Sequence, residues 1–292
     1  MRTPSWWDKV AFGRSGLSVS RVAIGSSYGI GGADLERAFE RGVNFFFFGL
    51  RRTRHYAAGV RALAPRHRDR MVIAIQSYSR SALLVKPSVH AALRALRVDH
   101  VDVLGLGWWN DAPPARIVDA ARALVDAGKV RHLLISSHHR PAFEALAKDP
   151  TYAGIMVRYS AAHPGAEREV FPHLGAADAP GVLAFTATRW GKLTEAELTP
   201  PGERTPTATD CYRFVLSSPH VHATLTGPRD AERLDEAMAA LDRGPMSPEE
   251  IAWMKRVGVA VREKAKAGGP IHFIDKLSAR FAGRHEPGPR QA

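Results

Sequence analysis

The chain has 292 residues, with 41 Lys and Arg against 29 Asp and Glu, so its formal charge is +12. Hydrophobic residues make up 45% and charged residues 24%, which is the composition of an ordinary globular protein. No apolar run approaches the roughly 18 residues of a membrane span, and the N-terminal residues lack the apolar stretch of a secretory signal peptide. The single cysteine, Cys211, excludes an internal disulfide and a cysteine-based metal site. We therefore expect a cytoplasmic protein.

The positive charge is spread along the chain and does not form blocks. No helix-turn-helix, RNA-binding or zinc-finger signature accompanies it, so a solvated surface is favoured over a nucleic-acid interface. One local concentration, formed by Arg51, Arg52 and Arg54, follows a predicted strand. Such a group of arginines can hold a carboxylate or a phosphate, or it can simply point to water.

From residue 21 onward, short apolar runs alternate with amphipathic segments. The apolar runs predict strands at 21–25, 43–48, 71–75, 101–106, 132–135, 154–158, 182–185 and 222–226. The segments between them predict helices at 33–41, 53–63, 87–96, 114–126, 141–147, 167–174, 207–216 and 230–241, and a further helix begins after Ser247. Pro87, Pro114 and Pro141 are expected in first turns of helices, and Gly128 just past a helix end.

Eight strands that alternate with eight helices, each strand apolar enough to be buried on both faces, predict parallel pairing. A closed (β/α)8 barrel, the TIM-barrel fold, and an open doubly wound sheet both satisfy this pattern. Eight units without a composition break or a dinucleotide-type glycine fingerprint favour the barrel. Residues 11–20 predict a hairpin that closes its floor. We expect one α/β barrel domain over residues 1–282, with an extra C-terminal helix, and a disordered tail at 283–292.

The active site of such a barrel lies at the C-terminal ends of its strands. The residues there are rich in aromatic, hydroxyl, histidine and arginine side chains and almost lack carboxylates. Gln76, Trp108 and Trp109 are candidate substrate contacts, although the tryptophans could instead fill space. His138, His139 and His163 could approach one another, but adjacent histidines point apart and no carboxylate joins them, so no metal is predicted.

Five segments of the chain resemble the aldo-keto reductases. They are residues 12–20, 38–46, 99–103, 128–136 and 226–236, and they occur in register on the predicted elements. The resemblance runs over roughly residues 11–241. It implies a (β/α)8 barrel that reduces carbonyl groups with NADPH.

The catalytic residues that the resemblance implies are absent from this chain. The family uses an Asp, a Tyr, a Lys and a His, whose positions fall here on Phe47, Arg52, Gln76 and Gly107. The phenol of Tyr56, with an arginine as the cation beside it, could replace the missing acid if the loop folds differently. Tyr56 could equally be an ordinary packing residue of its helix.

The positions that the resemblance assigns to the cofactor are partly kept. They are Ser136 for the nicotinamide amide, Phe185 for stacking on its ring, Gly227 and Arg229 for phosphate, and Glu236 for adenine. The neighbouring amide positions have become Ser137 and Met156. The resemblance therefore implies NADP(H) as the cofactor.

Together these features favour a divergent NADP(H)-linked oxidoreductase that acts on a small molecule. An anionic, partly planar substrate would suit the mouth, with Arg52 binding its charge and Tyr56 or His138 moving the proton. Two other readings stay open: a non-redox isomerase, lyase or cyclase, and a binding protein without catalysis.

Overall fold

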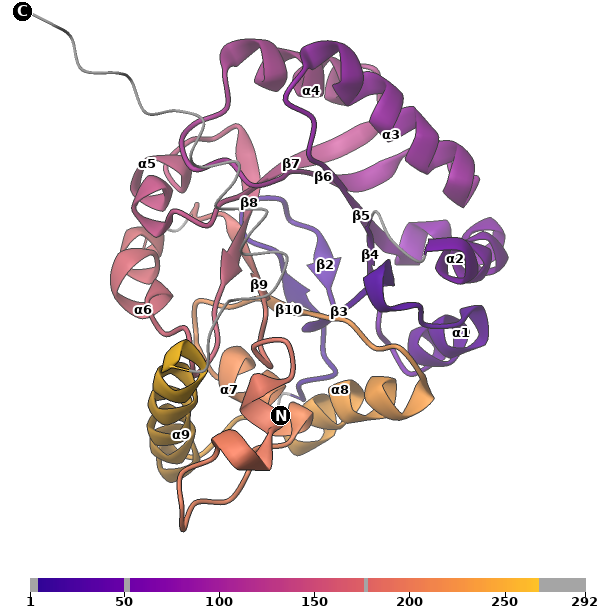
Figure 1. Cartoon of the computed structure of the whole chain (residues 1–292). Coiled ribbons are helices and arrows are strands. Elements are labelled where there is room, and N and C mark those ends of the chain that lie inside the picture. Colours follow the sequence, from indigo (N-terminus) through magenta and orange to yellow (C-terminus); the bar gives the residue numbers. More distant parts are fainter. Residues whose placement is uncertain (1–4, 50–52, 176–177, 268–292) are drawn as a thin grey trace, which may run out of the picture.

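The computed structural model describes residues 5–49, 53–175 and 178–267. Eight parallel strands close into a barrel in the order β10–β3–β4–β5–β6–β7–β8–β9 (Figure 1). These strands are β3 (Val22–Gly25), β4 (Phe45–Phe48), β5 (Val72–Ser77), β6 (Val101–Leu106), β7 (Val130–Ser136), β8 (Tyr152–Arg158), β9 (Gly181–Phe185) and β10 (Ala223–Thr226). The predicted barrel is confirmed, and each strand lies within two residues of its predicted bounds.

Helices surround the barrel and follow the strands in turn (Figure 1). They are α1 (Gly32–Glu40), α2 (Thr53–His67), α3 (Ala82–Leu96), α4 (Ala115–Asp126), α5 (Phe143–Leu146), α6 (Ala166–Glu169), α7 (Ala208–Leu216), α8 (Ala231–Arg243) and α9 (Pro248–Ala267). The predicted fifth and sixth helices are partly 3-10 turns, at Arg140–Ala142 and Phe171–Leu174. The extra C-terminal helix is α9, which packs beside α7.

The predicted start of α3 is wrong. The helix begins at Ala82, so Pro87 lies inside it and not in its first turn. The backbone bond that Pro87 cannot donate would have gone to the carbonyl of Leu83, four residues earlier. Leu83 is 85% exposed, so water can satisfy that carbonyl at little cost. Pro65 likewise lies inside the last turn of α2.

Two predicted helix ends are confirmed by their hydrogen bonds. After α4, Gly128 adopts φ 66°, and the N–H groups of Gly128 and Lys129 donate to the carbonyls of Val125 and Leu124. This pairing is the Schellman motif. At the start of α9, Ser247 and Glu250 exchange bonds, because each backbone N–H donates to the other's side chain at 2.9 and 3.2 Å.

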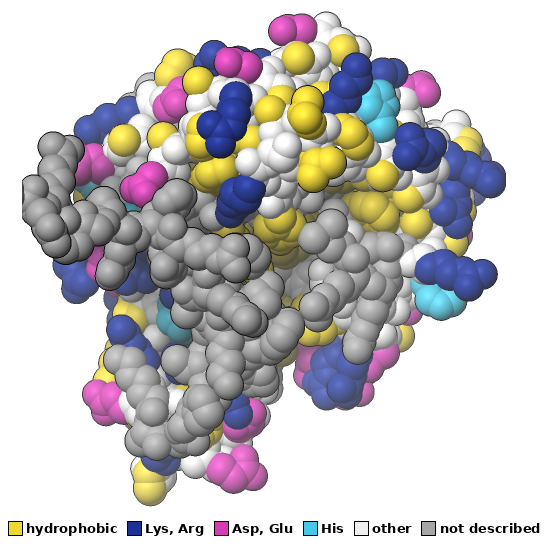
Figure 2. All heavy atoms as spheres, turned by 45° about the horizontal axis from the view of Figure 1, so that its top comes forward, with side chains coloured by type: hydrophobic (Ala, Val, Ile, Leu, Met, Phe, Trp, Pro, Cys, Tyr) yellow, Lys and Arg dark blue, Asp and Glu magenta, His cyan; other side chains and the backbone are white. Residues whose placement is uncertain are grey.

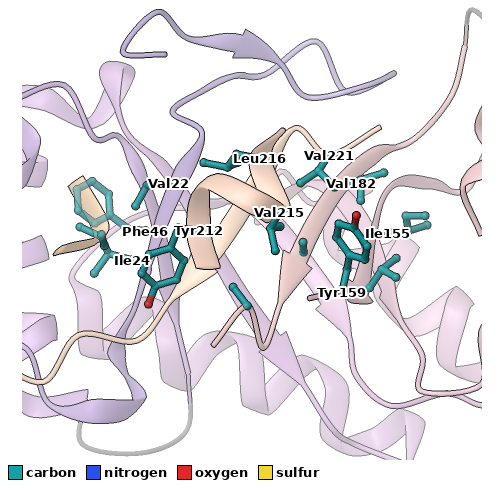
Figure 3. Packing of buried hydrophobic residues seen from close by; sticks show 14 of the residues in the cluster. Val22, Ile24, Phe46, Ile155, Tyr159, Val182, Tyr212, Val215, Leu216 and Val221 are labelled. Carbon is teal, nitrogen blue, oxygen red and sulfur yellow. The ribbon is translucent and has the colours of Figure 1, made fainter. Parts of the chain in front are cut away.

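The hydrophobic core has two parts. Inward-facing side chains such as Ala23, Phe45 and Leu183 fill the barrel, while a larger cluster lies between the barrel and its helices. In Figure 3, Val215 and Leu216 of α7 belong to this outer layer. Strand side chains alternate between the two parts, as expected for strands buried on both faces.

The predicted floor hairpin is formed by β1 (Val10–Ala11) and β2 (Ser18–Val19). Phe12 in its loop is fully buried, and a β-carbon on Gly154 or Gly181 would meet its ring at 2.7 or 2.6 Å. Because these two glycines have no side chain, the Phe12 ring fits beneath the barrel. Arg14 fixes the hairpin by donating to the carbonyls of Ala147, Asp149 and Asp178 at 2.8 to 2.9 Å.

The surface bears mixed charge. Lys and Arg side chains are scattered over the face shown in Figure 2, with Asp and Glu between them. None of the helices in the described ranges is both long and apolar enough to cross a membrane. The predicted tail at 283–292 lies outside the described residues.

Candidate functional site

The site lies at the carboxyl ends of β5, β6, β7 and β9. Because side chains alternate along a strand, Gln76 faces the same way as Ala74, which belongs to the barrel interior. Tyr78 lies two residues further on and continues this face beyond the end of β5. Gly107 follows directly on β6, next to this pair. These three residues form the centre of the site.

Three of the four positions that the family resemblance assigns to catalysis, those of Phe47, Gln76 and Gly107, carry nonionic residues. Phe47 is buried in the barrel interior, and Gln76 is only 8% exposed. A β-carbon on Gly107 would lie 2.6 Å from both the Gln76 side-chain nitrogen and the Tyr78 ring. The space that a histidine would need is therefore filled by Gln76 and Tyr78, and not by the tryptophans that follow.

Tyr78 is a site residue that the sequence analysis missed. Its hydroxyl donates a hydrogen bond to Gln76 Oε1 at 3.1 Å, which leaves the amide nitrogen of Gln76 buried without a partner among the described residues. Burial raises the pKa of the Tyr78 phenol to about 12. The spacing from Gln76 and the glycine at position 107 were the patterns that could have revealed it.

Four rings form a row across this end of the barrel. Tyr78 contacts Trp108 edge to face with ring centroids 4.9 Å apart. His138 stands edge to face against both Trp108 and Phe185, at 5.7 Å from each. The structure therefore brings together Gln76, Trp108, His138 and Phe185, as the sequence predicted for residues at strand ends.

Arg80 holds the backbone of this row in place. Its guanidinium donates to the carbonyls of Tyr78, Gly107 and Trp108 at 3.3, 3.0 and 2.6 Å. Trp108 has φ 58°, a left-handed conformation that is costly for a bulky residue and needs such support. Trp109 lies differently: it packs against the outer core layer beneath Arg80, whose guanidinium is 4.0 Å from its ring. The prediction of Trp109 as a substrate contact is therefore not supported.

His138 is half-buried, and its neutral form is favoured. Burial, reinforced by the charge of Arg158, lowers the pKa of His138 to about 4. Its Nε2 is buried and has no hydrogen-bond partner in the described part of the chain. Near neutral pH the imidazole is therefore not an acid and is only a weak base, which argues against its predicted role in moving a proton.

The prediction of Tyr56 as a replacement acid is wrong. Tyr56 is fully buried in the outer layer between α2 and the barrel, and its hydroxyl donates to the carbonyl of Ile24 at 2.6 Å. Burial raises the pKa of this phenol far above its usual value. Tyr56 is a packing residue of its helix, the alternative that the sequence left open.

The predicted anion site falls largely on residues that are not described. Arg51 and Arg52 lie outside the described ranges, while Arg54 and His55 are exposed in the first turn of α2. A metal site would need several ligating side chains close together. Within the described ranges, no three His, Cys, Asp or Glu side chains gather closely enough to hold a metal ion.

A second group of predicted residues lies at the end of β10 and on α8. A β-carbon on Gly227 would meet the ring of Tyr28, a 47% exposed side chain, at 2.4 Å, so a larger residue here would require that ring to move. Arg229 is exposed, and its Nε donates to the adjacent Asp230 at 3.0 Å. On α8, Glu236 accepts from Arg233 at 2.7 Å through one oxygen, while the other is buried and has no partner in the described residues.

Ser136, the predicted nicotinamide contact, lies at the end of β7, and the neighbouring positions Ser137 and Met156 lie just after β7 and within β8. Ser136 is buried at the end of β7, and its carbonyl accepts from the backbone of Trp109. Ser137 uses its hydroxyl within its own loop, where it bonds to the N–H and the carbonyl of His139. Met156 belongs to the barrel interior and offers no strong hydrogen-bonding group.

Comparison with solved structures finds the same fold. An aldo-keto reductase from Bacillus halodurans, in its holo form, superposes with a TM-score of 0.72 at 20% identity, covering 86% of this chain and 96% of that one. An aldo/keto reductase from Klebsiella pneumoniae, in complex with NADP and acetate, has a TM-score of 0.70 at 22% identity, covering 86% and 95%. At these identities the likeness shows the fold.

A sequence model of the aldo/keto reductase family matches residues 32–210, which is more than half of the chain. The match covers strands β4 to β9, including the row of rings and the positions of Phe47, Gln76 and Gly107. This protein therefore belongs to the aldo/keto reductase family.

Proposed function

We propose that this protein is a divergent NADP(H)-linked oxidoreductase acting on a small molecule that carries a carboxylate or phosphate. Family membership supports the reaction class, and the solved relative from Klebsiella pneumoniae is in complex with NADP. The observation that carries the cofactor assignment is Glu236. One of its carboxylate oxygens is buried without a partner in the described residues, and it would accept a hydrogen bond from an exocyclic amine such as that of adenine.

The other residues fit the same group. Arg229 is exposed beside the start of α8, where a phosphate would also meet the positive end of the helix. Gly227 adds no side chain at the end of β10, where the exposed Tyr28 ring packs against it. Phe185 offers a ring at the end of β9 for stacking, and Ser136 would meet the amide of the nicotinamide. The bound dinucleotide would supply or accept the hydride.

The experiment is a calorimetric titration of the purified protein with NADPH and with 2′,5′-ADP, the fragment that lacks nicotinamide. Glu236→Ala should weaken both ligands by about 10-fold or more, because it removes a charged acceptor of one hydrogen bond. Glu232→Ala, an exposed glutamate on the same helix, is the matched control and should bind as wild type. Absence of NADPH binding by the wild-type protein would refute the proposal.

A second candidate function is a dinucleotide-binding protein with little or no catalysis. The nonionic groups at the catalytic positions favour it, since Phe47 can neither donate nor accept a proton. A turnover screen separates the two candidates, because both bind NADPH and only the first consumes it. The proposal that the substrate is anionic depends on Arg52. Its side chain would bind the negative charge, while Gln76 and Trp108 would contact the reacting end of the substrate.

A further inference from the structure

We infer that Tyr78 protonates the carbonyl oxygen of the substrate in this barrel, and that Gln76 orients it and supplies a second hydrogen-bond donor. The inference rests on the proposed function, which provides the hydride. The acid would then come from a residue at the end of β5. The family resemblance expects it instead at the position of Arg52, which follows a different strand. Gln76 acts as a positioning residue, and Tyr78 as the catalytic residue.

The first support is the placement of the phenol. The Tyr78 ring occupies the space above Gly107, at the centre of the strand ends, and its hydroxyl is held at 3.1 Å from Gln76 Oε1. Any side chain at position 107 would displace the ring, because even a β-carbon would lie 2.6 Å from it. Glycine at this position therefore makes room for the phenol.

The second support is the unused donor beside the phenol. The Gln76 side-chain nitrogen is buried and has no partner in the described residues, and such a group costs free energy unless a ligand satisfies it. A carbonyl oxygen bound here would accept from this nitrogen, and the Tyr78 hydroxyl would turn away from Gln76 Oε1 to donate to the same oxygen. Two donors aimed at one oxygen stabilise the negative charge that develops there during reduction.

The third support is the rigidity of the pair. Arg80 bonds to three carbonyls around it, at Tyr78, Gly107 and Trp108, and the Trp108 ring packs edge to face on Tyr78. The left-handed backbone of Trp108 is strained, and strain of this kind persists where the surroundings fix it, often at functional sites.

The chemical step balances without a further reactant. When bound, the reduced dinucleotide would supply the hydride to the carbonyl carbon, and the electrons of the C=O π bond would move to oxygen. The Tyr78 phenol gives its proton to that oxygen, and water returns a proton to the phenolate. The products are an alcohol and the oxidised dinucleotide. Burial disfavours the Tyr78 phenolate, so the phenolate is poorly stabilised and the reaction is slow.

The test uses NADPH with 4-nitrobenzaldehyde and 4-carboxybenzaldehyde as probes, and follows the loss of NADPH absorbance over hours. Wild type should turn over at least one probe slowly, and Tyr78→Phe should be slower by roughly 100-fold or more. The control is Tyr152→Phe, which removes a phenol of similar pKa, about 12, at the start of β8 on the opposite end of the barrel. It should keep the wild-type rate.

A gain-of-function variant adds a readout that does not depend on substrate. Gln76→Lys places a cation beside the phenol and should lower the pKa of Tyr78 by about one unit or more, seen as phenolate absorbance in a pH titration and absent in the double variant with Tyr78→Phe. The rate near neutral pH should rise several-fold.

The outcomes separate the two proposals. If NADPH does not bind the wild-type protein, the proposed function fails. If NADPH binds but no probe is reduced, or if Tyr78→Phe reduces the probes as fast as wild type, the assignment of Tyr78 is overturned while cofactor binding stands. A Gln76→Lys variant with a lowered phenol pKa and no gain in rate also overturns it.

Discussion

Arg229 offers a direct test of how this barrel distinguishes NADPH from NADH, because only NADPH carries the 2′-phosphate. The side chain is 67% exposed, and its pair with Asp230 is a surface pair that contributes about 0–1 kcal/mol. A charge-assisted bond to phosphate contributes about 1.5–3 kcal/mol. Arg229→Ala should therefore weaken NADPH by a net of about 0.5–3 kcal/mol, roughly 2- to 140-fold, and leave NADH nearly unchanged.

The assay is a fluorescence titration of both reduced cofactors at about 0.15 M salt, where exposed charges are partly screened. The fold should survive the substitution, because Asp230 still caps α8 by accepting from the backbone of Arg233 at 3.0 Å. Arg41→Ala is the control, since Arg41 is also exposed and paired, at 3.2 Å with Asp242. Equal weakening of NADPH and NADH would show that Arg229 does not contact the 2′-phosphate.

Three further predictions concern stability and the substrate. Phe12→Ala should lower the free energy of unfolding by about 3–5 kcal/mol in urea denaturation, because it empties the floor of the barrel; a loss below 1 kcal/mol would mean that the floor contributes little. The hydrogen bond from Arg213 lowers the pKa of Glu250 to about 2. The interaction therefore stabilises the folded state above about pH 4.3, and this stabilisation is lost as the pH falls toward 2. The difference in unfolding free energy between wild type and Glu250→Gln should shrink over that range, and a constant difference would contradict this. Acidic metabolites should raise the melting temperature of wild type but not of Arg52→Ala, and equal shifts would exclude Arg52 as the anion contact.

The sequence predicted the barrel because its strands are apolar on both faces and its helices end at recognisable residues. Gly128 and Ser247 marked helix boundaries through local hydrogen bonds that depend only on neighbouring residues. The start of α3 could not be predicted from such local hydrogen bonds. The rule that places proline in a first turn assumes an unsatisfied carbonyl is costly, and exposure of Leu83 removes that cost.

The site was predicted less completely than the fold, for a physical reason. Residues at strand ends can be listed from sequence, and Gln76, Trp108, His138 and Phe185 do come together. Which of them face one another depends on packing across strands. The Tyr78 ring fits where it does because Gly107, which follows another strand, has no side chain. The Tyr56 hydroxyl is not available for catalysis because it donates to a backbone carbonyl in the core.

The floor hairpin ties the beginning of the chain to strands that are synthesised much later. Arg14 reaches a carbonyl 164 residues further along the sequence. At about 5–20 residues per second, the ribosome needs roughly 8–33 s to synthesise that intervening stretch. During this interval Phe12 and the hairpin have no barrel to close. The last stage of folding therefore joins distant parts of the chain, and closure of the barrel must wait until β9 has been synthesised.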